Sequence, residues 1–205
     1  MTRAYLVAAG LAAAALLLVT GAALRPLITD GHSPAPPVLT AEETAFVQDM
    51  YAHHSQALVM VDRLSEDASP EVRALAGQIA EVQRAESGMM LGWLRLAGES
   101  TVNPDPMAWM HVAPAGHGHT PAPEPMPGMA TRADLDALAA ARGPEAEAIF
   151  LRLMYFHHQG GMTMARAAMS VLPDGAVSRT AREMLRHQGQ EASVIGLLMG
   201  QREVR

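Results

Sequence analysis

Apolar residues between positions 41 and 65 recur every three or four residues, which is the spacing of one face of an α-helix. Thr40-Ala41-Glu42-Glu43 precedes them as a capping box and predicts where this helix begins. Two neighbouring apolar stripes together form a broad apolar face. Polar residues cover the opposite side of the predicted helix: Gln48, Asp49, Ser55, Gln56, Asp62 and Arg63.

Further helices are predicted at about 70–97, 131–142, 144–171 and 176–199 from their start and stop signals. Ser69-Pro70 supplies an N-cap and a first-turn proline for the first of them. Because the connections within each pair of long helices are short, the pairs should be antiparallel. The chain is therefore predicted to be all-α, a four-helix bundle of two helical hairpins joined by a long crossover.

The bundle is expected to occupy residues 40–205, after a Pro-rich linker at 26–39 that lacks apolar periodicity. The crossover at 99–130 holds eight prolines or glycines within 114–128 alone, so no regular helix is predicted there. A loop of this length is typically functional or disordered. Its methionine and histidine content favours a function.

The N-terminal segment 1–25 differs from the rest of the chain. Residues 4–24 are uncharged and lie between Arg3 and Arg25, and they are long enough to span a bilayer as a helix. They are predicted to be an apolar anchor helix. A cleaved signal peptide is the alternative, because Gly21-Ala22-Ala23 supplies small residues near the end of the run. Both interpretations place the following domain outside the cytoplasm, in the periplasm or at the cell surface.

The bundle contains an internal repeat, since segment 40–98 resembles segment 144–200. Met50-Tyr51-Ala52-His53-His54 returns as Met154-Tyr155-Phe156-His157-His158, 104 positions later. Adjacent residues on a helix lie about 100° apart, so both histidines of each pair fall within the broad apolar face. Two apolar helices that each carry a buried histidine pair are the main functional signal of the sequence.

Composition restricts the chemistry of this signal. The chain has 15 basic residues, all of them arginine, against 21 acidic ones, and no basic run, so nucleic acid is not expected as a partner. The absence of cysteine excludes disulfides, thiolate metal sites and thiol nucleophiles. The nine histidines and fifteen methionines are the borderline and soft metal ligands that remain.

Burying an imidazole without a partner costs roughly 1–3 kcal/mol, so four such groups in one bundle require a common explanation. One explanation is that His53, His54, His157 and His158 together bind a metal ion. The other is that each histidine bonds a carboxylate or hydroxyl on a facing helix. The symmetry of the two pairs favours metal binding.

Four methionines share the face of the histidine pairs at helical spacings. Thioethers combined with imidazoles, without thiolate, suit copper and particularly Cu(I). Simple packing in the core is the alternative, above all for the two that lie two turns away. These residues are Met50 and Met154, four positions before a histidine, and Met60 and Met164, seven positions after one.

Weaker candidates lie on the crossover and on the even-numbered long helices. Glu86 and Glu191 occupy equivalent places in the repeat. By default each is an exposed helix charge, but if they face the histidines they would orient imidazoles. His187 has Val82 as its counterpart and is given no role in the site. The crossover candidates, predicted as a metal-capture arm or a simple tether, are His117, His119, Met126 and Met129, beside Met107, Met110 and His111.

The residues described above resemble the domain of unknown function 305 family. The resemblance is carried by Phe46-x-x-x-Met50-x-x-His53-His54, by Pro127-Gly128-Met129 followed by Asp134-Leu135, and by Phe150-Leu151-x-x-Met154-x-x-His157-His158-Gln159-Gly160 with a later Met164-Ala165. It covers about residues 40–200 and implies a ferritin-like fold in an exported protein. Some members bind copper and are associated with copper tolerance, so the resemblance implies copper handling through both histidine pairs. Gly161 stands where many relatives have alanine, a difference that should be harmless.

We therefore expect an extracytoplasmic copper-binding protein that buffers or passes on the ion and is not an enzyme. A ferritin-like di-iron oxidase would need Glu on two helices and Glu-x-x-His on the other two. Met50, Tyr51, Met154 and Tyr155 stand where those glutamates would be. The third alternative is an anchored structural or interaction module without metal. The expected partners are a metal ion and the membrane, and a homo-oligomer or a metal-receiving protein remains open.

Overall fold

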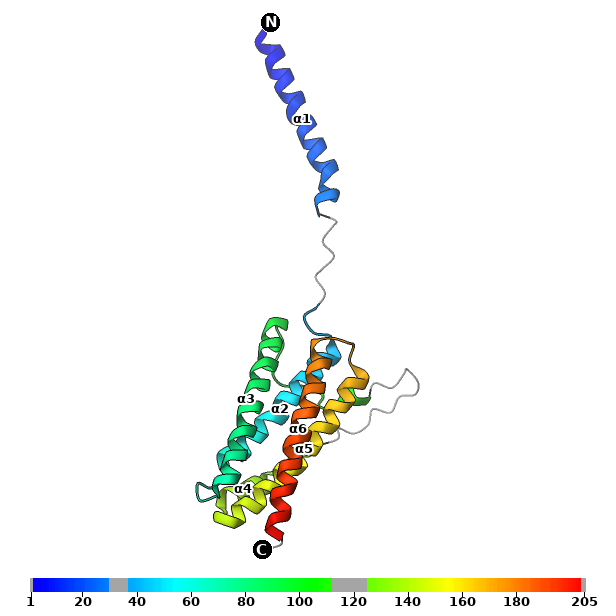
Figure 1. Ribbon diagram of the computed structural model, residues 1–205. Helices are drawn as coiled ribbons and strands as arrows, with labels where there is room; N and C mark the ends of the chain where they lie inside the picture. The colour runs from blue at the N-terminus through cyan, green and yellow to red at the C-terminus, as the bar shows by residue number, and fades with distance from the viewer. Residues whose placement is uncertain (1, 30–36, 112–124, 204–205) are drawn as a thin grey trace. The chain divides into compact units, whose positions relative to one another are not determined.

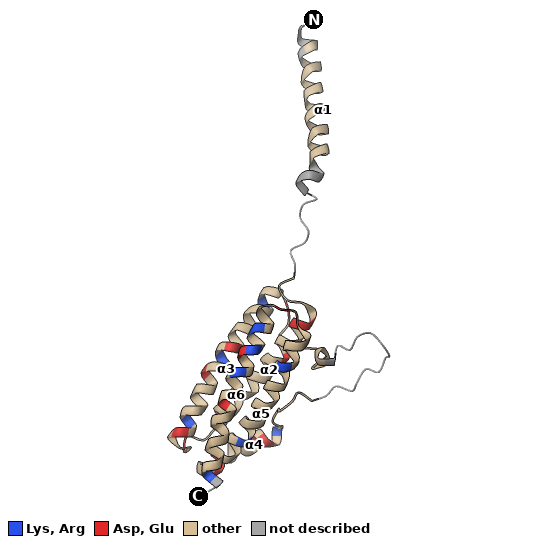
Figure 2. Cartoon of the chain, turned by 45° about the vertical axis from the view of Figure 1, so that its right-hand side comes forward, with Lys and Arg blue, Asp and Glu red and all other residues tan. Residues whose placement is uncertain are grey.

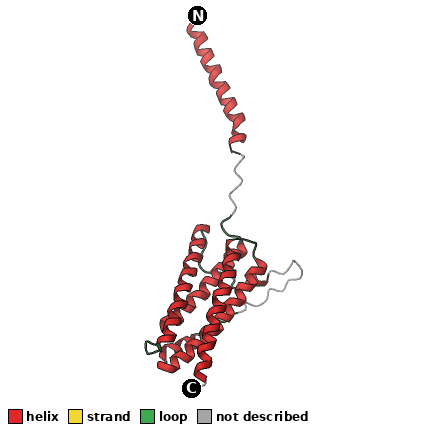
Figure 3. Ribbon diagram, viewed as in Figure 1, coloured by secondary structure: helices red, strands yellow, loops and turns green. Residues whose placement is uncertain are grey.

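The computed structural model of the protein describes residues 2–29, 37–111 and 125–203, and all regular structure in this part of the chain is helical (Figures 1 and 3). The predicted all-α class is confirmed. The elements, in chain order, are α1 (Thr2–Thr29), α2 (Ala41–Arg63), α3 (Pro70–Ala97), the 3-10 turn η1 (Ala108–His111), α4 (Arg132–Ala140), α5 (Gly143–Val171) and α6 (Ala176–Glu203).

The chain divides into two compact units, Met1–Pro37 and Val38–Arg205. In the first unit, Val7–Leu24 has a mean hydropathy of 2.2 and is long and apolar enough to cross a membrane, by length and composition alone. Figure 2 shows this stretch of α1 without acidic or basic residues, whereas both signs of charge are scattered over the helices of the second unit.

The second unit is the predicted bundle of two hairpins, α2–α3 and α5–α6, with α2 packed against α5. The capping box that opens α2 is complete, since Glu43 N–H donates to Thr40 Oγ1 at 3.2 Å and Thr40 N–H donates to Glu43 Oε2 at 2.9 Å. At the start of α3, Ser69 is the N-cap residue and Pro70 lies in the first turn, as predicted. The Ser69 side chain makes no capping bond, and the Ser69 N–H instead donates to Glu147 Oε1 of α5, 2.6 Å away.

Two hydrophobic clusters form the core of this unit. On α2 the first cluster includes Phe46 and Met50, and the second includes Ala57 and Met60, so the histidine pair lies between them. The order is reversed on α5, where Met154 belongs to the second cluster and Met164 to the first. The reversed order shows that α2 and α5 are antiparallel.

The side of α2 that the sequence pattern left polar is covered by the crossover. Gln48 and Asp49 are buried, with exposed fractions of only 5% and 1%. Gln48 Nε2 donates to the Ser100 carbonyl at 2.7 Å, and Gln56 exchanges two hydrogen bonds with the backbone of Ala130, at 2.7 and 2.9 Å. These polar side chains, on the side of α2 opposite its apolar face, therefore bond the backbone of the crossover instead of water.

Near its start, the crossover is fixed to α2 by hydrogen bonds and by packing against the core. Asp49 Oδ2 accepts hydrogen bonds from Met107 N–H at 2.7 Å, Trp109 Nε1 at 2.8 Å and Asn103 Nδ2 at 3.1 Å. Met107 and Trp109 are buried in the first cluster, where the Trp109 ring meets Phe46 edge-on at 5.2 Å. A buried carboxylate on α2 therefore anchors this segment.

Candidate metal centre

All four predicted histidines are fully buried in the middle of the bundle, with exposed fractions of 0%. α2 supplies His53 and His54, and α5 supplies His157 and His158. The His53 and His157 rings stack with centroids 3.7 Å apart and planes inclined by 30°. The rings within each pair are 6.5 and 6.3 Å apart, so the two repeats present their histidines in nearly the same way.

Each histidine uses its Nε2 atom for a hydrogen bond to an oxygen. In the inner pair, His53 bonds the Pro127 carbonyl at 3.1 Å and His157 bonds the His53 carbonyl at 3.0 Å. In the outer pair, His54 bonds Glu86 Oε2 at 2.6 Å and His158 bonds Glu191 Oε2 at 2.7 Å. Since carbonyl and carboxylate oxygens only accept, each Nε2 carries the proton.

The other ring nitrogen is free in all four cases. Nδ1 of each histidine is buried and has no hydrogen-bond partner. A neutral imidazole protonated at Nε2 has its lone pair on Nδ1, the form in which histidine ligates metals. A carboxylate or carbonyl bonded to the remote nitrogen is the usual support for such a ligand. The donor set therefore fits a metal that prefers imidazole.

Burial keeps the inner pair uncharged. Loss of solvation, together with the nearby His54, lowers the pKa of His53 to about 3. Burial and the other three histidines hold the pKa of His157 well below its usual value. At neutral pH both rings are therefore neutral and their Nδ1 lone pairs are available.

Glu86 and Glu191 lie where the sequence placed them, each bonded to a histidine rather than exposed to solvent. Burial acts to raise the pKa of Glu86, but hydrogen bonds and charge from His54 and His187 outweigh it, so this pKa is lowered. His187, to which the sequence gave no role, bonds Glu86 Oε1 through Nδ1 at 3.1 Å. Its side chain is about one-third exposed, with an exposed fraction of 34%.

Two glutamines belong to this region although the sequence analysis did not select them. Gln83 and Gln188 are each 1% exposed, and Gln83 Oε1 and both amide atoms of Gln188 lack partners. They lie one turn before Glu86 and Glu191, so the repeated Gln-x-x-Glu pattern was the available signal. With the four histidines and two glutamates they make a polar layer between the two hydrophobic clusters, in which all members are buried except the half-buried Glu191: His53, His54, Gln83, Glu86, His157, His158, Gln188 and Glu191.

Gly161 leaves room for this layer. A Cβ atom there would lie 2.1 Å from Gln188 Oε1 and 2.8 Å from its Cδ. An alanine at this position would therefore require the Gln188 amide to move, whereas the glycine of this chain accommodates it.

The predicted methionines are fully buried, but they are divided between the two clusters. Met50 and Met164 lie in the first cluster, and Met60 and Met154 lie in the second. They therefore flank the polar layer on both sides instead of gathering on one. Whether they bind metal stays a prediction at this point.

The crossover returns to the site through a short strap, Pro127–Ala130. Gly128 has a φ of 75° and packs on α5 so closely that a Cβ atom would lie 2.4 Å from the Phe156 carbonyl oxygen. Met126 and Met129 are half-buried, and Met126 packs against the first cluster. The other two crossover candidates, His117 and His119, lie outside the described residues.

Among the described residues, no group of three or more His, Asp or Glu side chains converges in an arrangement that could hold a metal ion. The four lone pairs are present, but the stacked rings do not direct them at one point. Binding of an ion would therefore require the side chains to turn.

Comparison with known proteins identifies the family. No curated protein matches the chain. The crystal structure of a DUF305 protein from Streptomyces coelicolor is 35% identical, with a TM-score of 0.69, over 79% of this chain and 94% of that one. A DUF305 fragment from Deinococcus radiodurans is 31% identical, with a TM-score of 0.64, over 81% of this chain and 99% of that one.

A more distant neighbour, CopM in its Cu(I)-bound form, shares the fold at 22% identity, with a TM-score of 0.57, over 78% of this chain and 96% of that one. The family model for DUF305, a domain of unknown function, matches residues 43–197. The chain therefore belongs to the DUF305 family.

Proposed function

We propose that this protein binds copper in the middle of its bundle, through Nδ1 of His53, His54, His157 and His158. One observation carries the proposal: four buried ring nitrogens have no partner, while the opposite nitrogen of each ring donates to an oxygen. Leaving four buried acceptors unpaired costs free energy, and a bound cation would use all four lone pairs.

Copper is favoured over other ions by the chemistry around the histidines. Imidazole alone suits zinc, copper, iron and nickel. Thioethers flank the polar layer on both sides, and thioether ligands favour Cu(I). CopM, a neighbour in fold, has been solved in Cu(I)-bound and Cu(II)-bound forms, which supports the same ion here.

The proposed role is to buffer the ion or pass it on outside the cytoplasm, without catalysis. The apolar segment Val7–Leu24 supports export, as an anchor or as a cleaved signal. The Streptomyces coelicolor relative is described as a candidate secreted protein, in agreement with this location. A di-iron oxidase is disfavoured because Glu86 and Glu191 already bond imidazoles and no Glu-x-x-His motif precedes either pair.

The unit Val38–Arg205 contains both hydrophobic clusters, so it has its own core and can be studied without the first 37 residues. Cu(I) and Cu(II) should be titrated into this fragment against a chelator of known affinity. We expect at least one tightly bound ion, lost when His53, His54, His157 and His158 are all replaced by Ala. The matched control His187→Ala removes a histidine that bonds Glu86 but not the ion, and it should keep the site.

The outcomes separate the alternatives. Cu(II) retained by a folded quadruple variant would move the site to the crossover, with His117, His119, Met126 and Met129 as the remaining donors. Uptake of iron instead of copper would support the oxidase, and uptake of no metal would support a structural module. If the quadruple variant does not fold, the pair His54→Ala and His158→Ala replaces it, because the stacked inner pair is then left intact.

A further inference from the structure

The internal repeat relates the two ends of the bundle to each other, but the buried side chains at equivalent positions of the two ends differ in chemical type. Helices α3 and α6 repeat with a spacing of 105 positions, which aligns Gln83 with Gln188 and Glu86 with Glu191. The same alignment pairs Ile79 with Met184 and Met90 with Ile195. Together with the α2–α5 repeat, this alignment defines a set of four equivalent buried residues at each end of the bundle, one from each long helix.

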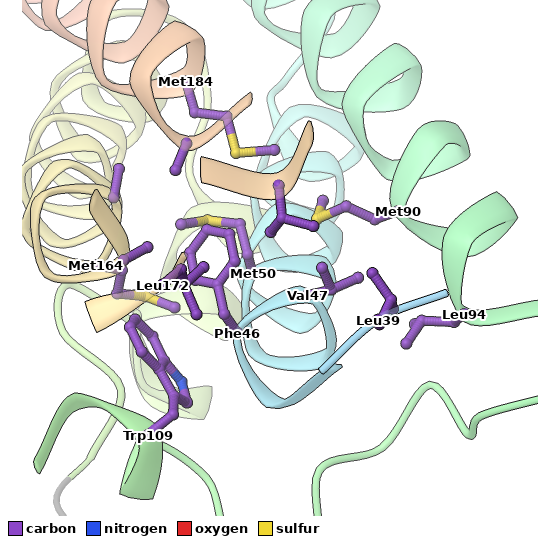
Figure 4. Packing of buried hydrophobic residues seen from close by; sticks show 14 of the residues in the cluster. Leu39, Phe46, Val47, Met50, Met90, Leu94, Trp109, Met164, Leu172 and Met184 are labelled. Atoms are coloured by element: carbon purple, nitrogen blue, oxygen red, sulfur yellow. The ribbon is translucent and has the colours of Figure 1, made fainter. Parts of the chain in front are cut away.

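At the end formed by the first cluster, all four of these residues are methionines, which we call the Met layer: Met50, Met90, Met164 and Met184. Each has an exposed fraction of 0%. Figure 4 shows the four side chains entering one packed region from four different helices. The equivalent residues at the other end are two methionines and two isoleucines: Met154, Ile195, Met60 and Ile79.

The need to fill space does not account for this difference. Isoleucine is fully buried at the equivalent positions of the other end, so an aliphatic residue packs well in this setting. Methionine differs from isoleucine in having a polarizable thioether on an unbranched chain with three rotatable bonds. Such a side chain can change its conformation more easily than the branched isoleucine side chain.

A buried carboxylate, Asp49, lies one residue from Met50 on the crossover side of α2. Asp49 is adjacent to Met50, whereas its repeat counterpart is the apolar Leu153. All hydrogen bonds to the Asp49 carboxylate come from neutral donors, and among the described residues no cation pairs with it.

Thioethers also connect the Met layer to the surface. Met110 and Met126 of the crossover and Met169 of α5 are partly buried and pack against the same cluster. Met107, whose N–H is bonded by Asp49, is buried within it. Soft donors therefore continue from half-exposed positions to the four buried ones.

We propose that the Met layer is a second site, distinct from the histidines, for a soft monovalent cation such as Cu(I) or Ag(I). Met50, Met90, Met164 and Met184 supply neutral thioether ligands, which suit soft ions. The buried Asp49 carboxylate, one residue from Met50, reduces the cost of burying the single positive charge. The site takes the ion from the crossover side through Met110 and Met126.

Silver is the best probe, because Ag(I) is soft, monovalent and stable in air. Titration of the fragment Val38–Arg205 with Ag(I), combined with X-ray absorption at the silver edge, should detect an ion with sulphur ligands only. The variant Met90→Ile with Met184→Ile places in this layer the residues that the other end already carries, so it should fold. We expect it to bind this ion more weakly by at least about tenfold, since half of the ligands are lost.

The matched control Met60→Leu with Met154→Leu removes two thioethers from the other end and should keep the sulphur-only ion. The quadruple histidine variant should also keep it, so failure of the histidine site and failure of the Met layer are distinguishable. Wild-type affinity in the Met90→Ile, Met184→Ile variant would overturn the proposal. Detection of only nitrogen ligands around Ag(I) in the wild type would also overturn the proposal, and the Met layer would then serve core packing alone.

Discussion

His157 contacts His53 in two ways: the rings stack 3.7 Å apart, and His157 Nε2 donates to the main-chain carbonyl of His53 at 3.0 Å. The repeat would allow the reciprocal bond from His53 to His157, but it does not form. His53 bonds the Pro127 carbonyl instead. The crossover thus breaks the symmetry of the bundle at its centre and fixes the orientation of one inner ring.

The hydrogen bonds predict the tautomer of every histidine in the polar layer. In the metal-free fragment at neutral pH, His53 and His157 should be neutral and protonated at Nε2, because a proton on Nδ1 would be buried without an acceptor. Nε2 of His54 and of His158 should also carry a proton, because each bonds a carboxylate oxygen. Nitrogen-15 NMR of the imidazole rings distinguishes the tautomers directly. An Nδ1–H form at His53 or His157 would remove the proposed ligand atom and contradict the assignment.

The pKa of the inner histidines predicts how stability depends on pH. The folded pKa of His53 is about 3, against an ordinary pKa of 6.5 for histidine, so below pH 6.5 the unfolded chain takes up a proton that the folded chain does not. Stability should be constant above this value and fall as the pH drops toward 3, with a slope of about 1.4 kcal/mol per pH unit from His53 alone. His157, whose pKa is also depressed, adds in the same direction.

Urea unfolding of the metal-free fragment between pH 7.5 and pH 5 would measure this dependence. His53→Gln, which cannot take up a proton in either state, should reduce the slope. Equal stability of the wild type at the two ends of this range would show that the inner histidines are not buried as neutral groups.

The carboxylates that hold the outer histidines should influence metal affinity. Glu86→Gln keeps an oxygen that can accept from His54 Nε2 but removes the negative charge, so copper affinity should fall by about 10- to 100-fold. Glu81→Gln is the matched control, since Glu81 is exposed on the same helix and should have no effect. Competition titrations of the two variants would measure the difference, and equal affinities would exclude Glu86 as a support of the site.

The strap should be sensitive to a single methyl group. In Gly160→Ala the new Cβ would lie 2.0 Å from the Pro127 carbonyl oxygen, so the strap must move and His53 loses its acceptor. We expect a loss of about 1–3 kcal/mol in the free energy of unfolding. Gly77→Ala is the contrasting variant in α3, where nothing lies within 4 Å, and it should stabilise the protein by about 0.5–1 kcal/mol. Thermal unfolding of both variants tests the contrast, and a harmless Gly160→Ala would mean that the strap is not held there.

The sequence by itself determined the helices, their pairing in hairpins and the burial of both histidine pairs. These follow from apolar periodicity and from local signals such as the Thr40–Glu43 capping box, which act within a few residues. The internal repeat also placed Glu86 and Glu191 in equivalent positions, and both bond histidines, the less expected of the two roles that the sequence allowed.

Only the tertiary structure decided which atoms of these residues are free. The acceptor of His53 comes from Pro127, and the acceptor of His157 is His53 itself, 104 positions away in sequence. Burial of Asp49 and the division of the methionines between two clusters likewise depend on segments distant in the chain. Periodicity reports which face of a helix is buried, but it does not report what lies against that face, because that depends on how the whole chain packs.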